Sequence, residues 1–149
     1  MQSFLRQDVP GSRRVVIMGC GRIGAATAAA LSEEGCRVNI LDLNKSAFDL
    51  LPKGMIDDGH IVPIIGDGTL ESDLRKASTH ECDVFIAVSG KDTRDALGAQ
   101  IAKHVLQVPV VVCRMNDPIR KEMYGQLGLV TISATNLVTD MIVEAAAAR

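Results

Sequence analysis

The sequence predicts an α/β domain built on a doubly wound sheet of six parallel strands, and two observations carry this prediction. Segments typical of strands and of helices alternate six times along the chain, which is the pattern of parallel strands joined by right-handed crossovers. A Gly-x-Gly-x-x-Gly motif at residues 19–24 follows the apolar run Val15–Met18 and precedes Ala25–Leu31, a run rich in small residues. A buried strand, a glycine turn and a closely packed helix, in this order, open a Rossmann fold.

The composition fits one domain with an aliphatic core. The chain has 149 residues, of which 47% are hydrophobic and 3% aromatic, as expected for parallel strands covered on both faces. The net charge is −2 and the basic residues are scattered, which argues against nucleic acid as a partner. No apolar run approaches the roughly twenty residues of a membrane span, so we expect no direct membrane insertion. The N-terminus lacks the pattern of a signal peptide.

The alternating segments give the expected elements. The expected strands are residues 13–18, 37–41, 60–65, 83–88, 109–113 and 129–132. The expected helices are residues 22–34, 45–51, 70–77, 92–105, 118–125, and a last helix from Thr135 or Asn136 to Ala148. Residues 1–12 show no periodicity and are expected to be an N-terminal leader, with the domain spanning residues 13–149.

Local signals predict where several helices begin and end. Gly35 is expected to end the first helix and Pro52 the second. The residues expected to cap helix starts are Asn44, Thr69 and Asp117, the last with Pro118 at the first helical position. Pro63 removes a ladder donor from the third strand, which we therefore expect at a sheet edge or with a bulge.

The three motif glycines have separate roles in binding a nucleotide. Gly19 permits the tight turn, Gly21 lets a pyrophosphate approach the backbone, and Gly24 lets the helix lie close to the strand. The helix N-terminus adds free N–H groups and a positive dipole end. The alternative interpretation is a structural glycine turn in a protein that binds no nucleotide.

Asp42 favours nucleotide binding over that alternative. It ends the second strand about twenty residues after the motif, where a carboxylate can accept hydrogen bonds from both ribose hydroxyls. A 2′-phosphate would meet the like charge of this carboxylate, so NADP is disfavoured. NAD(H), ATP, ADP and AMP remain open as ligands.

Four loops are expected to meet in one crevice at the carboxyl ends of the strands, where ligands of open α/β sheets bind. The residues of these loops expected to hold the nucleotide are Gly19, Cys20, Gly21, Arg22, Ile23, Gly24, Asp42, Leu43, Asn44, Gly66, Asp67, Gly68, Thr69, Val88, Ser89 and Gly90. This convergence is stronger evidence than any single motif.

Two charged residues of these loops each leave two interpretations open. Arg22 lies within the phosphate turn and either pairs with terminal phosphates or faces solvent at the helix start. Asp67 either accepts a hydrogen bond from the adenine amino group or caps the following helix.

The sequence shows no catalytic apparatus. His60, His80 and His104 have no partners at triad or metal spacing and are expected on the surface or on helices. No serine or cysteine nucleophile with a nearby base is visible. The chain also leaves no room for the separate region that would hold a hydride acceptor or donor. We therefore expect a protein that is not an enzyme and that binds neither a catalytic metal nor a substrate.

The four cysteines, Cys20, Cys36, Cys82 and Cys113, are expected to be buried reduced thiols, because no pair has Cys-x-x-Cys spacing. Cys20 is an exception in one respect. It lies close to a helix N-terminus, which would lower its thiol pKa and permit a redox role.

Several ordered motifs together resemble the TrkA-N domain of the RCK/KTN family. They are Gly-Cys-Gly-Arg-Ile-Gly at 19–24, Asp42, Gly-Asp-Gly-Thr at 66–69, Val-Ser-Gly-Lys-Asp at 88–92, Val-Cys-Arg at 112–114, Leu-Gly-Leu at 127–129 and Ile-Ser at 132–133. The resemblance covers nearly the whole chain from Arg13. Members of this family are cytosolic regulators of potassium channels and of Trk- and Ktr-type transporters.

The resemblance implies a non-catalytic dimer, often assembled into rings of eight domains on a membrane channel or transporter subunit. Such a protein is cytoplasmic and reaches the inner membrane only through its partner. The resemblance also implies how a nucleotide is bound. The glycine loop would hold its phosphates, Asp42 would hold its ribose, and Asp67 and Thr69 would lie beside its adenine. The chain departs from the family at Asp95, where members often have Asn, and at Gly68, where they often have Ala. The family's smaller C-terminal lobe is also missing, which implies a stand-alone module or a piece of a longer protein.

The last expected helix predicts how such a dimer forms. Its apolar residues form two stripes, Leu137, Met141 and Ala145, and Val138, Ile142 and Ala146, with Val143 beside them. We expect the domain itself to cover one stripe and a second copy to cover the other. In the family that the chain resembles, this helix crosses to the neighbouring subunit.

The leading hypothesis is a nucleotide-sensing regulatory domain of a potassium transport system. Two alternatives remain: the cofactor-binding part of an NAD-dependent oxidoreductase, and a redox-state sensor that controls a different process.

Overall fold

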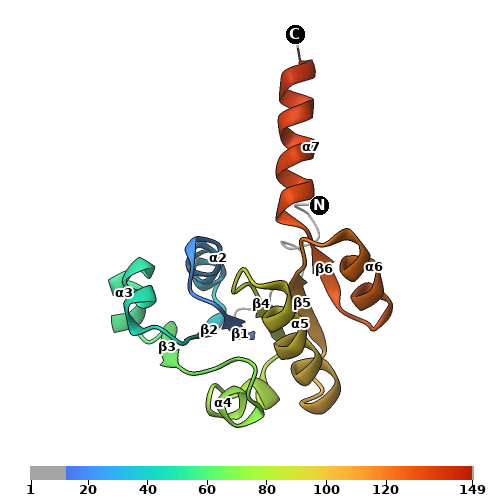
Figure 1. Cartoon of the computed structure of the whole chain (residues 1–149). Helices are drawn as coiled ribbons and strands as arrows, with labels where there is room; N and C mark the ends of the chain where they lie inside the picture. The colour runs from blue at the N-terminus through green and yellow to red at the C-terminus, as the bar shows by residue number, and fades with distance from the viewer. Residues whose placement is uncertain (1–12, 149) are drawn as a thin grey trace.

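The computed structural model describes residues 13–148, so the expected leader lies outside the described residues. Within that range the chain forms a sheet of six parallel strands in the order β3-β2-β1-β4-β5-β6, as Figure 1 shows. The strands are β1 Arg14–Met18, β2 Arg37–Asp42, β3 Ile61–Ile65, β4 Val84–Ala87, β5 Val110–Arg114 and β6 Val130–Ile132. The reversal of strand order between β1 and β4 confirms the doubly wound topology.

Helical segments connect all the strands. The α-helices are α2 Arg22–Glu33, α3 Lys53–Asp57, α4 Glu71–Lys76, α5 Asp92–Gln100, α6 Pro118–Gln126 and α7 Ala134–Ala147. The other helical segments are the 3₁₀-helices η1 Lys45–Leu50 and η2 Thr79–Glu81 and the π-helix η3 Ile101–Val105, which continues α5. The short helix α3, which begins directly after Pro52, is absent from the sequence-based prediction.

Two aliphatic clusters cover the two faces of the sheet. Along β1, Val15 and Ile17 point into the cluster that includes residues of α2, whereas Val16 and Met18 point into the cluster that includes residues of α4 and α5. All four side chains are at most 3% exposed. A strand buried on both faces in this way explains why the sequence shows a continuous apolar run instead of alternation.

Most of the local signals are confirmed. Pro63 lies in β3, which is an edge strand, so the missing N–H leaves no gap in the interior of the sheet. Gly35 has a φ of +95° directly after α2, as a helix-ending glycine requires. The Asn44 side chain accepts from the Ser46 N–H at the start of η1, and Asp117 caps α6 with Pro118 at its first position.

Two predicted helix starts are wrong. The Thr69 hydroxyl donates to Asp67 and does not cap α4, whose N-cap residue is Leu70, without a side-chain bond. Helix α7 begins at Ala134, before Thr135 and Asn136, because the Ser133 hydroxyl oxygen accepts from the Asn136 N–H at 3.1 Å. Ser133, which lies between the expected strand 129–132 and the expected helix, is thus the N-cap residue of α7.

Helix α7 stands apart from the rest of the described chain, rising away from β6 in Figure 1. It contains no buried residue, and Val138, Met141, Ile142 and Val143 are each more than half exposed. The expectation that the domain covers one apolar stripe of this helix is therefore wrong. Among the described residues, no helix has both the length and the apolar character needed to cross a membrane.

Candidate functional site

The four predicted loops all follow the carboxyl ends of strands, on one edge of the sheet, and backbone bonds tie neighbouring loops together. We call residues 19–24, 42–44, 66–69 and 88–90 the four-loop site. The Gly19 N–H donates to the Leu41 carbonyl at 2.8 Å, the Gly66 N–H to the Asp42 carbonyl at 3.0 Å, and the Val88 N–H to the Met18 carbonyl at 2.9 Å. The structure thus brings these residues to one place, as the strand order requires.

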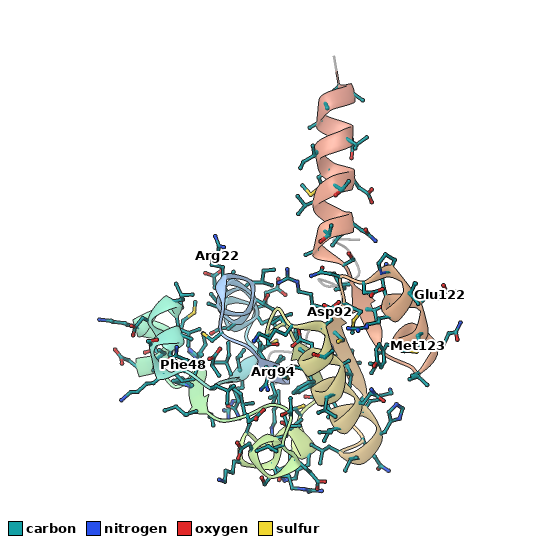
Figure 2. The ribbon with its side chains drawn as sticks, viewed as in Figure 1. Arg22, Phe48, Asp92, Arg94, Glu122 and Met123 are labelled. Carbon is teal, nitrogen blue, oxygen red and sulfur yellow. The ribbon has the colours of Figure 1, made fainter. Side chains whose placement is uncertain are left out.

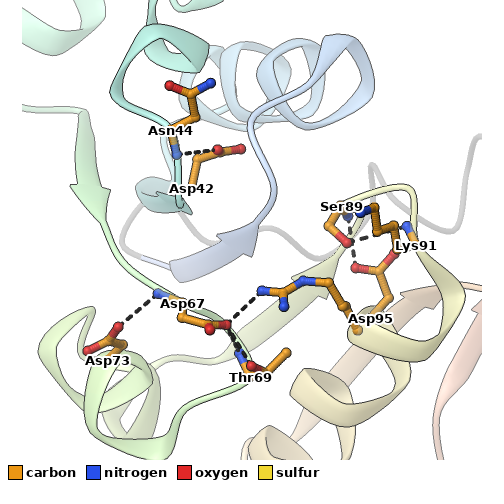
Figure 3. Close-up of polar contacts among 9 residues, drawn as sticks. Asp42, Asn44, Asp67, Thr69, Asp73, Ser89, Lys91 and Asp95 are labelled. Atoms are coloured by element: carbon orange, nitrogen blue, oxygen red, sulfur yellow. Dashed lines mark hydrogen bonds and ion pairs between the residues drawn. The ribbon is translucent and has the colours of Figure 1, made fainter.

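Asp42 is half-buried at the end of β2 and lies against the glycine loop. Its Oδ2 accepts from the Cys20 N–H at 2.8 Å and its Oδ1 accepts from the Asn44 N–H at 2.9 Å, the second of which is drawn in Figure 3. A carboxylate has about four acceptor positions, so each oxygen retains one that these bonds do not use. The side chain is therefore fixed in direction and can still accept two hydroxyl groups.

The glycine loop is tight at two positions and open at the third. Gly19 has a φ of +106°, and a Cβ built on it would lie 2.6 Å from the Ser89 Cα. A Cβ on Gly24 would lie 1.9 Å from the Gly19 carbonyl oxygen, so α2 starts in contact with the loop itself. A Cβ on Gly21 would have no heavy atom within 4 Å, so this glycine faces open space.

The N-terminus of α2 carries no side-chain cap. Gly21 is its N-cap residue, the first turn holds no acidic residue, and the first bond of the helix runs from the Ala25 N–H to the Gly21 carbonyl. The N–H groups of the first turn are thus available to an anion. Arg22 is exposed and extends outward from the start of α2 in Figure 2, and it forms no ion pair with any residue of 13–148.

Asp67 organises the loop after β3. Its Oδ1 accepts from the Thr69 N–H at 2.9 Å, from the Thr69 hydroxyl and from the Arg94 guanidinium at 2.7 Å, while its own N–H donates to Asp73 (Figure 3). The hydrogen bonds from Thr69, with a contribution from Arg94, lower the pKa of Asp67. The bond to Thr69 forms a turn just before α4, so the capping interpretation is wrong in detail; contact with adenine stays a prediction.

The side chain of Met18 accounts for the glycine at position 68. A Cβ on Gly68 would lie 2.4 Å from the Met18 Cγ, and a Cβ on Gly98 would lie 2.6 Å from its Sδ. The long Met18 side chain thus fills the space between the β3–α4 loop and α5. A residue larger than glycine at position 68 would compete with Met18 for the same space.

Two acidic residues that the sequence reasoning did not assign hold further loops. Asp95 is fully buried; its Oδ1 accepts from the Ser89 N–H at 2.8 Å and its Oδ2 from the Gly90 N–H at 3.2 Å. Burial raises the pKa of Asp95, although these hydrogen bonds oppose the shift. Asp92 accepts from the Asn116 and Asp117 N–H groups at 3.0–3.2 Å. In the sequence, both residues fall in the first turn of the expected helix 92–105, and this position is the signal that could have pointed to them.

Arg114, the last residue of β5, and Asn116, two residues after it, also lie at this edge. The Arg114 Nε and the Asn116 Oδ1 are buried and have no hydrogen-bond partner in the described part of the chain. Val112, two residues earlier on β5, packs into the cluster on the α2 face, so Arg114 emerges on that face. An unpaired buried donor at this edge is a group that a ligand can satisfy, and Arg114 is a second cation that could pair with a phosphate.

The cysteines are buried free thiols, as predicted, but the expectation of a lowered pKa at Cys20 is wrong. Burial, and secondarily the charge of Asp42, raise the pKa of the Cys20 thiol to about 11. Its Sγ donates to the Ala47 carbonyl at 3.4 Å. The physical basis for a reactive thiolate at neutral pH is therefore absent, because the effect of burial exceeds that of the helix N-terminus.

The histidines are exposed, as predicted. Within residues 13–148, no three His, Cys, Asp or Glu side chains are grouped so that they could hold a metal ion.

Comparison with curated proteins gives several Trk system potassium uptake proteins. The Trk system potassium uptake protein TrkA of Streptomyces coelicolor is 35% identical over 128 residues, which cover 86% of this chain and 56% of that protein. A TrkA homolog of Pyrococcus horikoshii is 31% identical over 110 residues, covering 74% of this chain and 46% of the homolog. The chain thus spans about half the length of the curated relatives that it matches.

Comparison with solved structures shows the same fold at low identity. The TrkA-N domain of the inner membrane protein ybaL from Escherichia coli has a TM-score of 0.76 at 11% identity, covering 89% of this chain and 95% of that one. GsuK bound to ADP has a TM-score of 0.73 at 21% identity, covering 87% of this chain and 32% of GsuK. The Shewanella denitrificans Kef CTD in AMP-bound form has a TM-score of 0.71 at 23% identity, covering 89% of this chain and 79% of that one.

The family model of the TrkA-N domain matches residues 15–135, which include all four loops of the site and all six strands apart from Arg14, the first residue of β1. With the 35% identity to the Streptomyces protein, this match shows that the chain belongs to the TrkA-N domain family.

Proposed function

We propose that this chain is a nucleotide-sensing regulatory domain of a potassium transport system, and that it binds NAD(H) or an adenine nucleotide at the four-loop site without catalysing a reaction. The observation that carries the proposal is the pairing of Asp42 with the uncapped N-terminus of α2. Asp42 retains an acceptor position on each oxygen, and the adjacent helix start offers free N–H groups. In a Rossmann site, a carboxylate at the end of the second strand binds the ribose, and the N–H groups at the start of the first helix bind the neighbouring phosphates.

The choice of ligand class rests on charge and on similar structures. The carboxylate of Asp42 opposes a 2′-phosphate, so NADP is disfavoured. GsuK has been solved with ADP and the Kef CTD with AMP. In this proposal the phosphates bind residues 19–24, Asp42 holds the ribose, and Gly66–Thr69 and Val88–Gly90 border the ligand.

The proposed regulatory role rests on the names of the relatives and of the similar structures. The curated relatives are named for potassium uptake, and one similar structure is that of the GsuK channel, with a TM-score of 0.66 at 22% identity. We infer a membrane potassium channel or transporter subunit as the partner, and a cytoplasmic location at the inner membrane through that partner. Neither nucleic acid binding nor insertion into the bilayer is part of the proposal.

The assembly that we infer is a homodimer, with rings of several domains as a further level. Its support is α7, whose apolar side chains Leu137, Val138, Met141, Ile142 and Val143 are between 40% and 69% exposed. A second copy of the same helix could cover these side chains in a self-complementary contact.

A thermal-shift screen of the full chain against NAD⁺, NADH, NADPH, ATP, ADP and AMP tests the proposal. A ligand at about one hundred times its dissociation constant stabilises the folded state by about 2.7 kcal/mol, so a bound nucleotide raises the melting temperature by several degrees. NADPH is expected to give the smallest shift. No shift with any of the six would overturn the proposal, and NADH oxidation coupled to reduction of a small molecule would favour the oxidoreductase alternative.

A further inference from the structure

The first turn of α5 presents two carboxylates, Asp92 and Asp95, that both accept from the backbone of neighbouring loops. One loop, Ser89-Gly90, belongs to the four-loop site; the other, Asn116-Asp117, precedes α6. Among the residues of 13–148, neither carboxylate forms an ion pair with a basic side chain. Their role is therefore to hold backbone.

Asp95 fixes the Ser89-Gly90 loop in direct contact with the phosphate turn. Both of its oxygens are used, one by each N–H of the loop, and the side chain is 0% exposed. The Ser89 backbone then lies so close to Gly19 that a Cβ there would be 2.6 Å from the Ser89 Cα. A displacement of Ser89 would therefore either press on Gly19 or break the bond to Asp95.

Asp92 ties the same helical turn to the start of α6. It accepts from the Asn116 and Asp117 N–H groups, and Asp117 in turn caps α6 by accepting from the Ile119 N–H at 2.9 Å. Helix α6 packs against β6, which leads directly into α7. A close packing contact at Gly19 and a series of hydrogen bonds through the first turn of α5 thus connect the glycine loop to α6.

We propose that the first turn of α5 is a clamp that positions the Ser89-Gly90 loop for nucleotide binding and links occupancy of the site to α6. Asp95 is the positioning residue of the site and Asp92 is the link. The proposal rests on the proposed function and adds a regulatory path to it. Because coupling between two sites is reciprocal, a link that transmits binding to α6 also contributes to the affinity.

The positioning role is tested with ADP as the probe, by calorimetric titration of the full chain and its variants. Asp95→Ala removes both acceptors and is expected to weaken ADP binding about tenfold or more, the effect of losing a hydrogen bond to a charged group. Asp95→Asn keeps one oxygen, which can accept from the Ser89 N–H, and is expected to restore part of the affinity. Asp83→Asn is the matched control, because Asp83 accepts from the Arg14 N–H at the opposite edge of the sheet, at 2.9 Å. ADP affinity in Asp95→Ala and Asp95→Asn equal to that of Asp83→Asn would overturn the positioning role.

The link is tested by hydrogen exchange of residues 116–126 with and without ADP. In the unaltered chain, ADP is expected to slow their exchange at least about fivefold, the lower end of typical couplings. Asp92→Ala, which removes the acceptors for the Asn116 and Asp117 N–H groups, is expected to abolish most of this change and to weaken ADP binding less than Asp95→Ala does. An equal change in Asp92→Ala and in the unaltered chain, or no change in either, would overturn the link. If ADP and the other nucleotides do not bind at all, the proposed function fails; if ADP binds and these variants behave as the control, only the clamp fails.

Discussion

The four-loop site and α7 differ in how many of their interactions the described chain supplies: most polar groups of the site are hydrogen-bonded within the chain, whereas the apolar side chains of α7 remain exposed. At the site, side chains and backbone of neighbouring loops bond one another, as between Asp42 and Cys20 or between Asp95 and Ser89. The groups left open there are few: the first N–H groups of α2, acceptor positions on Asp42 and the buried Nε of Arg114. On α7, by contrast, no residue is buried, and Met141, the most exposed of its large apolar side chains, is 69% exposed.

The chain itself therefore preorganises the site but does not cover the apolar face of α7. A site whose loops are held before the ligand arrives loses little conformational entropy on binding. An apolar helix face that remains in water is unfavourable by about 25 cal/mol per Å² and is therefore expected to be covered by another protein surface.

The largest effect is expected from filling the space between α2 and the glycine loop. Gly24→Ala places a Cβ 1.9 Å from the Gly19 carbonyl oxygen, a backbone atom that cannot move aside without opening the turn. We expect a loss of about 3 kcal/mol or more in the free energy of unfolding, at the upper end of overpacking effects. Urea denaturation measures this loss.

Gly21→Ala is the matched control for that substitution, because its Cβ meets no heavy atom within 4 Å. It is expected to change the free energy of unfolding by less than about 1 kcal/mol. Equal losses in the two variants would show that the glycine loop is not tightly packed against α2.

The next effect concerns α7. Met141→Glu combined with Ile142→Glu places two charges where we infer contact with a second copy, and burial of such side chains contributes about 1.5–3 kcal/mol each. The dissociation constant of the dimer is therefore expected to rise by about two orders of magnitude or more, as measured by sedimentation. Asp140→Lys, on the polar side of the helix beside Glu144, is the control. A monomeric unaltered chain at micromolar concentration, or a double variant that stays dimeric, would contradict the inferred interface.

A smaller effect is expected at Asp67, and it depends on pH. Its pKa is lowered in the folded state, so its contribution to stability is complete above the unfolded pKa of about 3.9 and is lost as the pH falls through the lower folded pKa. Asp67→Asn is therefore expected to cost about 1 kcal/mol at pH 7, with the difference shrinking as the pH falls from about 5 to about 3. Unfolding by urea at several pH values measures the difference, and a constant difference over this range would contradict the assignment.

The smallest effect is expected at Arg22. Because its side chain is exposed, its loss in Arg22→Ala should weaken ATP binding by about 1 kcal/mol and NAD⁺ binding by less. The reason is that a guanidinium at the start of α2 is expected to pair with terminal phosphate oxygens, which NAD⁺ lacks. Titration of both ligands measures the two changes; equal losses would indicate a general electrostatic role.

Much of the fold follows from local sequence signals. Short apolar runs predict β1 and β5, and Pro63 predicts that β3 is an edge strand. The parallel arrangement of the strands follows from the alternation of strands and helices. The glycine motif with Asp42 predicts which loops meet at the carboxyl edge. Helix ends are predicted where a side chain caps its own helix, as at Asn44 and Asp117.

The features that the sequence did not predict depend on tertiary contacts. Asp95 and Asp92 accept hydrogen bonds from loops outside their own helix. The backbone N–H groups that donate to Asp92 lie 24 and 25 positions further along the chain. The pKa of Cys20 depends on burial, which outweighs the local effect of the helix end. The exposure of α7 follows from where β6 directs the chain, which the amphipathic pattern of the helix alone does not reveal.

Binding of a nucleotide at the four-loop site through Asp42 is tested by calorimetric titration of ADP and NADH into the full chain and into Asp42→Ala. We predict one binding site per chain, weakened by about 1–3 kcal/mol in Asp42→Ala because hydrogen bonds to a charged group are lost. Asp42→Arg is expected to admit a 2′-phosphate and so to bind NADPH better than the unaltered chain does. Unchanged affinity for both ligands in Asp42→Ala, or no binding to the unaltered chain, would contradict the account.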